Sequence, residues 1–368
     1  MGRELCDASA YPAPLLAVAA YGLPGTTPDF PPGTLDSGAW KAALAGAGKH
    51  RLTGLLSAAI TDGALPATSE QAREARAAHR TAQLRVLTLE HELVAIVDLL
   101  TGAGIDCRVL KGSALAHLDY ADPGLRSYND IDILLRPEDI ERAVAVLAGT
   151  GFTRTLAEPR PGFDQRFDKG MTLRPSANYE LDLHRTFVLG PWGRRVRLDE
   201  LWASSQELVV AGRTMQALSQ PHRFLHVCYH TALGNWPLRL GSLRDTAEVL
   251  RTVDEAAVRS IAKGWGVEAI VAAAVADTAR LLGVDGWSWA ESYVLDRREE
   301  SWLGLHTRTD KTFAAQAVAT LRVLPWRDKP AYLRALVLPD SRYTADRHAS
   351  TFSRFTYAVK EVRRGTRR

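Results

Sequence analysis

The stretch LKGSALAHLDYADPGLRSYNDIDILL, residues 110–135, decides how this 368-residue chain is organised. It opens where a short apolar segment ends in a glycine turn, and it closes on the apolar run IDILL, which predicts a buried strand. Between them, SALAHLDY predicts a helix and ADPGLRSYND predicts a loop. A strand, a turn, a helix and a second strand in so short a stretch indicate a compact module of strands and helices.

The turn Lys111-Gly112-Ser113 is predicted to bind phosphate. The first N–H groups of a helix have no partner within it, and the positive end of the helix dipole lies there. Gly112 lets a phosphate approach the backbone, and the Ser113 hydroxyl can donate to it. Lys111 and Arg126 are expected to be further phosphate partners, although Arg126 could instead pair with an acid.

Asp130 and Asp132 lie two residues apart at the start of the second strand. Strand alternation places both carboxylates on one face, with Ile131 and Ile133 on the other. Two like charges held side by side are unfavourable unless a cation joins them, and oxygen ligands favour Mg²⁺ or Mn²⁺. The pair therefore predicts a site for one or two divalent metal ions.

A later segment, NYELDLH at 178–184, returns to strand character. Alternation places Glu180, Asp182 and His184 on one face. A third carboxylate beside the first two would complete a two-metal site and could accept the proton of an attacking hydroxyl. Asp182 is the expected residue and Glu180 its competitor, whereas His184 is interpreted as an ordinary histidine at a strand end.

These motifs resemble the signature of the polymerase β-like nucleotidyltransferase superfamily, in which a Gly-Ser turn precedes an Asp-x-Asp strand. The fuller pattern is similar to an uncharacterised bacterial nucleotidyltransferase family. The elements that match are LKGSAL (110–115), Pro123 and Arg126, DIDILL (130–135), DLH (182–184) and the histidine-bearing stretch 224–250. The resemblance spans residues 80–350 and implies a mixed sheet with flanking helices, a divalent metal and transfer of a nucleoside monophosphate from an NTP.

Applied to this chain, the resemblance implies a role for each matching residue. Gly112 and Ser113 would hold the NTP phosphates. Asp130, Asp132 and Asp182 would be the catalytic carboxylates and the ligands of Mg²⁺ or Mn²⁺.

The rest of the chain predicts an α+β protein with a small mixed sheet between helical regions. Residues 1–101 are expected to be helical, and within them TSEQ at 68–71 offers a capping-box start for a helix that runs to about Thr101. Residues 102–190 are expected to form the catalytic core. From about residue 195 the pattern is mostly helical, so 191–368 is expected to be a helical C-terminal region.

The composition is that of an ordinary globular protein, with 46% hydrophobic and 24% charged residues. The sequence shows no run of 18 apolar residues and no signal peptide with a basic start and an apolar core. A cytoplasmic protein without a membrane span is therefore expected. The net charge of +4 favours an anionic small substrate over nucleic acid. Cys6, Cys107 and Cys228 are expected to be reduced and structural.

A second histidine pattern places His222, His226 and His230 on one helical face. This spacing can bind zinc, but the sequence has no HExxH glutamate, and helix packing is the favoured interpretation. An intermediate interpretation is that His226 or His230, with Arg239 and Asp245, lines the cleft and touches base or acceptor.

The predicted activity is metal-dependent transfer of a nucleoside monophosphate to an acceptor, with release of pyrophosphate. A small molecule or peptide is the favoured acceptor because the helical flanks are large enough to build a pocket. Two alternatives stay open. One is a catalytically inactive nucleotide-binding scaffold of a biosynthetic complex, and the other is a toxin–antitoxin nucleotidyltransferase acting on tRNA or protein.

Overall fold

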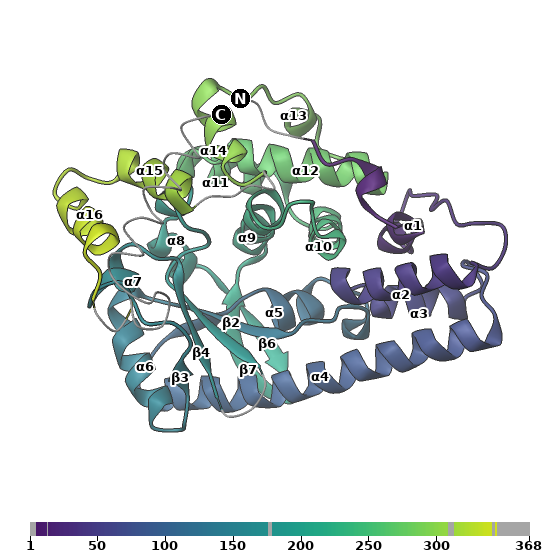
Figure 1. The fold of residues 1–368 in the computed structure, drawn as a ribbon, viewed down its shortest axis with the longest axis horizontal. Helices are drawn as coiled ribbons and strands as arrows, with labels where there is room; N and C mark the ends of the chain where they lie inside the picture. The colour runs from purple at the N-terminus through teal and green to yellow at the C-terminus, as the bar shows by residue number, and fades with distance from the viewer. Residues whose placement is uncertain (1–4, 13, 176–178, 308–312, 341–342, 344–368) are drawn as a thin grey trace.

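A seven-stranded mixed sheet lies at the centre of the molecule, with helices on both faces (Figure 1). The structure, a computed structural model, describes residues 5–12, 14–175, 179–307, 313–340 and 343. The strands are β1 Cys107–Val109, β2 Asp130–Leu135, β3 Thr153–Arg154, β4 Gly170–Arg174, β5 Glu180–His184, β6 Ser205–Val210 and β7 Arg213–Leu218. This arrangement confirms the expected α+β fold with a small mixed sheet and flanking helices.

The strand order is β3-β4-β5-β2-β1-β7-β6, which puts the strand of the Asp130/Asp132 pair at the middle of the sheet. β2 runs parallel to β5, and β1 runs parallel to β7. The other neighbours are antiparallel. Because β2 and β5 are parallel neighbours, the two acidic segments found in the sequence lie side by side and point the same way.

One face of the sheet packs on the long helix α4 (Ser69–Gly102) and on α6 (Ile140–Ala148) (Figure 1). The helix α4 starts with the capping box expected from TSEQ, because Thr68 and Gln71 each bond the backbone N–H of the other. Its apolar residues between Val86 and Leu100 share one core with Ile131, Ile133, Leu181 and Leu183. The apolar halves of both acidic strands are therefore buried on this side.

The opposite face is covered by helices from both ends of the chain. The helix α9 (Gln220–Leu233) lies over the strands, and it packs against α10 (Leu240–Leu250), α11 (Glu255–Trp265) and α12 (Glu268–Leu282). The N-terminal helices α1 (Leu15–Ala20), α2 (Ser37–His50) and α3 (Thr53–Thr61) join α10 in a separate core. The remaining helices are α5 Lys111–Leu118, α7 Phe163–Arg166, α8 Leu198–Ala203, α13 Ser288–Glu291, α14 Arg297–Gly304, α15 Phe313–Val323 and α16 Lys329–Val337.

The hairpin β6–β7 differs from the helical pattern expected after residue 195. Its strands pair antiparallel, and β7 joins the sheet beside β1. Ala211 and Gly212, both with positive φ (48° and 77°), make the two-residue turn between them. Buried Leu208 and Val210 alternate with more exposed residues, which is the period of a strand. The sheet therefore extends beyond residue 190, and the boundaries at 101 and 190 stay predictions.

Two further expectations concern cysteines and membrane spans. Cys6, Cys107 and Cys228 are all unpaired and buried. Across the part of the chain that the structure describes, no helix combines the length and the apolar character needed to cross a membrane.

A buried ion pair ties the end of α5 to α9. The Arg223 guanidinium donates to both carboxylate oxygens of Asp119, at 2.6 and 2.9 Å, and the two side chains are 2% and 0% exposed.

We predict that Asp119→Ala lowers the free energy of unfolding by about 3–5 kcal/mol, since it leaves a charge buried without its counter-ion. Urea denaturation measures the loss. The control is Asp98→Ala, which breaks the half-exposed pair with Arg213 and should change stability by less than about 1 kcal/mol; equal losses would contradict this account.

Candidate functional site

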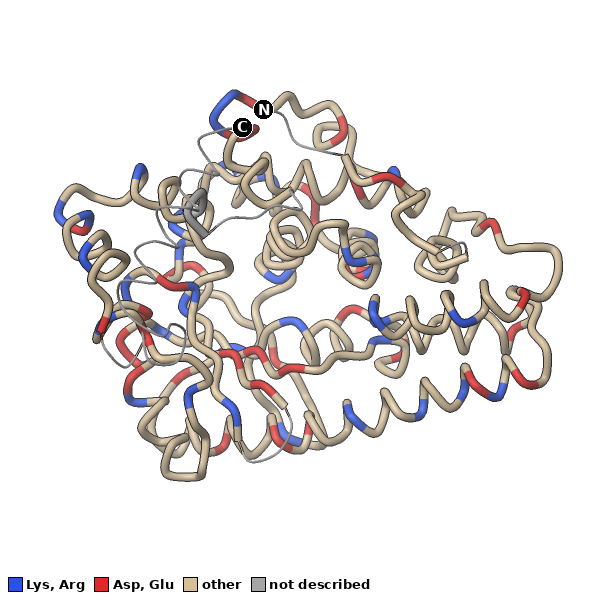
Figure 2. Tube along the Cα trace, viewed as in Figure 1, with Lys and Arg blue, Asp and Glu red and all other residues tan. Residues whose placement is uncertain are grey.

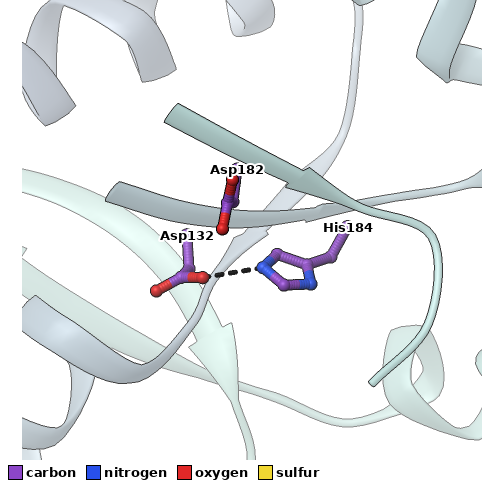
Figure 3. A group of neighbouring side chains, drawn as sticks. All are labelled: Asp132, Asp182 and His184. Atoms are coloured by element: carbon purple, nitrogen blue, oxygen red, sulfur yellow. Dashed lines mark hydrogen bonds and ion pairs between the residues drawn. The ribbon is translucent and has the colours of Figure 1, made fainter. Parts of the chain in front are cut away.

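The register of β2 and β5 brings the predicted carboxylates together. Asp132 pairs with Asp182, and Asp130 pairs with Glu180. Acidic positions consequently gather on neighbouring strands at the centre of the molecule (Figure 2). Asp132, Asp182 and His184 point toward one another on the sheet face that looks toward α9 (Figure 3).

Asp132 is held by two basic groups. Lys111 Nζ lies 2.7 Å from its Oδ1, and His184 Nε2 lies 2.7 Å from the same oxygen. The Asp132 side chain is 2% exposed. Burial alone would raise the pKa of Asp132, but Lys111 and His184 outweigh it and hold that pKa well below its usual range. Asp132 is therefore an anion with a fixed orientation.

Lys111 reaches Asp132 from an unusual backbone conformation. It is the first residue of α5 and has a φ of 36°, in the left-handed region that residues with side chains rarely adopt. Burial lowers the pKa of Lys111, but Asp132 and Asp130 more than compensate, so that pKa is raised and the amine stays charged. A strained residue with a buried charge beside a carboxylate is typical of a functional site.

Three side chains can hold a metal ion. One donor atom from each of Asp132, Asp182 and His184 lies within 4.8 Å of the others. The ring nitrogen of His184 that faces the carboxylates is Nε2, which bonds Asp132 Oδ1 at 2.7 Å, whereas the buried Nδ1 lies on the far side of the ring and has no hydrogen-bond partner among the described residues (Figure 3). Two carboxylates and an imidazole nitrogen fit a divalent cation. His184, interpreted from the sequence as an ordinary strand-end residue, thus belongs to the group.

Asp130 lies outside this group of three. Its side chain is 28% exposed, and its Oδ1 is 3.4 Å from Arg51 Nη2. Two adjacent aspartates were expected to need a metal to offset their charges. Here Lys111 lies beside Asp132 and Arg51 lies beside Asp130, so the need for a metal does not follow from charge alone. A metal role for Asp130 stays a prediction.

Asp182 and its competitor Glu180 occupy different surroundings. Asp182 is half-buried, and its Oδ1 accepts a hydrogen bond of 2.5 Å from Thr172. Glu180 is exposed and pairs with Arg174. The arrangement therefore favours Asp182 as the third carboxylate.

The Gly112-Ser113 turn is covered by Tyr128. A Cβ on Gly112 would lie 3.0 Å from the Tyr128 ring, and the Ser113 hydroxyl, buried, lies 2.8 Å from the Tyr128 hydroxyl. Tyr128 in turn donates to Glu90 at 3.0 Å. The glycine is needed for packing, and the serine side chain already has a partner. Phosphate binding at this turn stays a prediction that now rests on backbone N–H groups of the first turn of α5.

Arg126 pairs with an acidic residue, which was the alternative to phosphate binding that the sequence left open. Its guanidinium donates to both oxygens of Asp245, at 2.7 and 2.8 Å, and to the Gly112 carbonyl at 3.1 Å. Tyr120 also donates to Asp245. Both members of the ion pair are less than a tenth exposed. Asp245, which was considered as a cleft residue, is therefore the counter-ion of Arg126 and joins α10 to the turn.

We predict that Arg126→Ala destabilises the fold by about 3–5 kcal/mol, because it leaves Asp245 buried without its counter-ion. Its effect on nucleotide affinity, measured by titration under conditions where the variant is folded, should be less than about threefold. A stable variant that has lost nucleotide binding would show that Arg126 contacts phosphate after all.

The three histidines of α9 do not form a zinc site in the described part of the chain. His222 bonds Ser204 and Ser219, at 3.1 and 2.8 Å from its Nδ1. His226 packs on Phe187 with ring centroids 4.6 Å apart. Burial and the Lys111 cation hold the pKa of both His226 and His230 well below the usual range. These two histidines are therefore neutral and face the charged group on the sheet.

Neutral buried histidines make stability depend on pH. In the unfolded chain His226 and His230 take up protons near pH 6.5, whereas in the fold they resist protonation. The unfolded state thus binds more protons below that pH. The contribution of the two histidines to the free energy of unfolding is therefore complete above about pH 6.5 and declines on acidification.

We predict that the free energy of unfolding falls by up to about 1.4 kcal/mol per pH unit for each histidine between pH 6.5 and 5. His226→Gln should reduce this slope in urea titrations; an unchanged slope would contradict the assignment.

A mixed sheet that presents a Lys-Gly-Ser turn and a group of carboxylates on its central strands defines a nucleotidyltransferase. The chain belongs to the family described as uncharacterised nucleotidyltransferases, whose profile matches residues 36–283, two thirds of the chain. This confirms the resemblance found in the sequence and the classification as an enzyme. No curated protein matches the chain.

Several solved structures share parts of the fold. The antibiotic-resistance factor ANT(2'')-Ia has 16% identity and a TM-score of 0.35, covering 50% of this chain and 92% of its own. The lincosamide adenylyltransferase LnuA, bound to lincomycin, has 16% identity and a TM-score of 0.31, covering 45% and 97%. A nucleotidyltransferase-like protein from Paracoccidioides brasiliensis has 12% identity and a TM-score of 0.33, covering 57% and 97%. The assignment rests on the family match.

Proposed function

We propose that the protein is a metal-dependent nucleotidyltransferase that transfers a nucleoside monophosphate from an NTP to a nucleophile on a small molecule, with release of pyrophosphate. The observation that carries the proposal is the pairing of Asp132 with Asp182 across the parallel strands β2 and β5. Family membership indicates the class of reaction, and the two carboxylates are the groups at which we propose it takes place.

Each residue of the group has a part in this reaction. Asp132 and Asp182 would hold Mg²⁺ or Mn²⁺, and such an ion would supply charge neutralisation for the transferred phosphoryl group. His184 orients Asp132 through its 2.7 Å hydrogen bond. Lys111 supplies a cation next to the reacting phosphate. Asp182, which is less buried than Asp132, accepts the proton of the attacking hydroxyl.

A cavity beside Asp182 and His184 supports a small acceptor. Its volume is about 240 Å³. Both polar and aromatic side chains line it, including Arg154, Phe163 and Lys169 together with Asp182 and His184. A small molecule or part of a peptide fits such a volume. An acceptor bound there would place its nucleophile next to the proposed base.

Label transfer tests the proposal. The protein is incubated with each α-labelled NTP, with Mg²⁺ or Mn²⁺, and with a panel of hydroxyl- and amine-bearing small molecules. We predict that Asp132→Asn and Asp182→Asn each reduce transfer at least about a hundredfold, since each removes a charge that holds the metal. Thermal unfolding shows whether each variant is folded.

The matched control is Glu180→Gln, on the same strand and the same face but exposed and paired with Arg174. It should stay within about twofold of the wild type. If the wild type transfers no label from any NTP, the proposed activity is wrong. If Glu180→Gln is as damaging as Asp182→Asn, the assignment of the third carboxylate is wrong.

A further inference from the structure

Two arginines that are far apart in the sequence, Arg51 and Arg239, lie near Asp130. Arg51 follows the last residue of α2, and Arg239 precedes the first residue of α10. Both line one small recess together with His230, at the edge of the group of carboxylates. Arg51 Nη2 is 3.4 Å from Asp130 Oδ1. Neither arginine belongs to the strand–turn–helix motif from which the activity is argued.

Contacts between the end of α2 and the start of α10 hold the backbone beside the two arginines. The backbone N–H of Leu240 donates to His50 Nδ1 at 3.2 Å, so the end of α2 caps the start of α10. A Cβ on Gly241 would lie only 2.4 Å from the His50 carbonyl oxygen, so a glycine is required there. Arg51 itself has a φ of 64°, a left-handed conformation that glycine adopts more easily. The backbone at Arg51 would therefore be less strained with a glycine than with the arginine that occupies it.

The charges of these two arginines are incompletely compensated. The buried arginines Arg126 and Arg223 each have a carboxylate that accepts two hydrogen bonds, whereas Arg51 and Arg239 are half-buried. Arg51 has only the 3.4 Å contact with Asp130. No hydrogen bond or ion pair of the Arg239 guanidinium is found among the described residues. Burial lowers the pKa of Arg239 and the neighbouring Arg51 cation lowers it further, and Asp130 and Asp245 offset these two effects only in part.

We propose that Arg51 and Arg239 bind the β- and γ-phosphates of the NTP. This inference rests on the proposed nucleotidyl transfer and names the residues that hold its leaving group. The Gly112-Ser113 turn, where such contacts were expected, has its side chains covered by Tyr128. Two guanidinium groups beside Asp130 instead present several N–H donors to phosphate oxygens, in the planar geometry that suits them. The recess between them, at about 10 Å³, has room for little more than a water molecule, so the leaving pyrophosphate would lie over the two guanidinium groups rather than inside the recess.

Inorganic pyrophosphate tests this inference without turnover. It is titrated calorimetrically into the full-length protein with Mg²⁺, and the unphosphorylated nucleoside is titrated in parallel. The informative variant is Arg51→Gly, because glycine suits a φ of 64°. Its Tm should be unchanged or higher while its Kd for pyrophosphate rises roughly tenfold to a hundredfold. Arg239→Gln should raise the Kd by a similar factor, and Arg239→Lys by less. Nucleoside binding should not change in any variant.

The control is Arg73→Ala, which removes an exposed arginine from α4 and should leave the Kd for pyrophosphate unchanged. Wild-type affinity in both Arg51→Gly and Arg239→Gln would overturn the inference, as would a wild-type protein that does not bind pyrophosphate. The two proposals fail separately. If pyrophosphate binding depends on the arginines but no label is ever transferred, the phosphate site stands and the activity is wrong. If label is transferred and both variants bind normally, only the phosphate site is wrong.

Discussion

Five residue pairs join β2 to β5 in parallel, and this pairing places the carboxylates of the site and His184. Its register is fixed by the other face of the strands, where Ile133, Leu181 and Leu183 are fully buried. Each contributes about 1.5–3 kcal/mol by leaving water. A shift by one residue would turn Asp182 toward the core and a leucine toward the site. The position of the carboxylates is thus determined by apolar residues that take no part in the chemistry.

The same pairing concentrates negative charge, and the protein offsets it with its own cations. Lys111 contacts Asp132, while Arg51 contacts Asp130. A divalent ion that binds these carboxylates must compete with an ammonium and a guanidinium for the same oxygens. Once displaced, those cations remain beside the site, where they are attracted to the negative charge of a polyphosphate. Metal and nucleotide binding are therefore expected to reinforce each other.

Local patterns in the sequence predicted most of this arrangement. The capping box at Thr68, the apolar run of β2 and the alternation in β5 are signals contained in a few residues, and all three elements formed as expected. The sequence also left open whether Arg126 pairs with an acid. It could not show that Tyr128 covers Gly112 or that Asp245 accepts from Arg126, because these contacts depend on how distant segments pack.

Two features were not predicted, for separate reasons. The strands of the hairpin β6–β7 lie between helical segments, and the alternation of buried residues that marks β6 becomes apparent only in the fold. One histidine at a strand end carries no signal of its own, so the sequence did not place His184 in the group. His184 contacts Asp132 because the neighbouring strand brings that carboxylate within hydrogen-bonding distance.

The single helix α4 links the two halves of the molecule. Its first half meets the N-terminal helices, where Glu74 accepts from Trp40, and its second half lies under the sheet. With 34 residues at about 1.5 Å each, it is about 50 Å long. One residue inserted at its middle would rotate the N-terminal half by about 100° relative to the sheet and carry Arg51 away from Asp130. Sequence length should consequently be held constant within α4 across functional relatives, with insertions confined to loops such as residues 24–33.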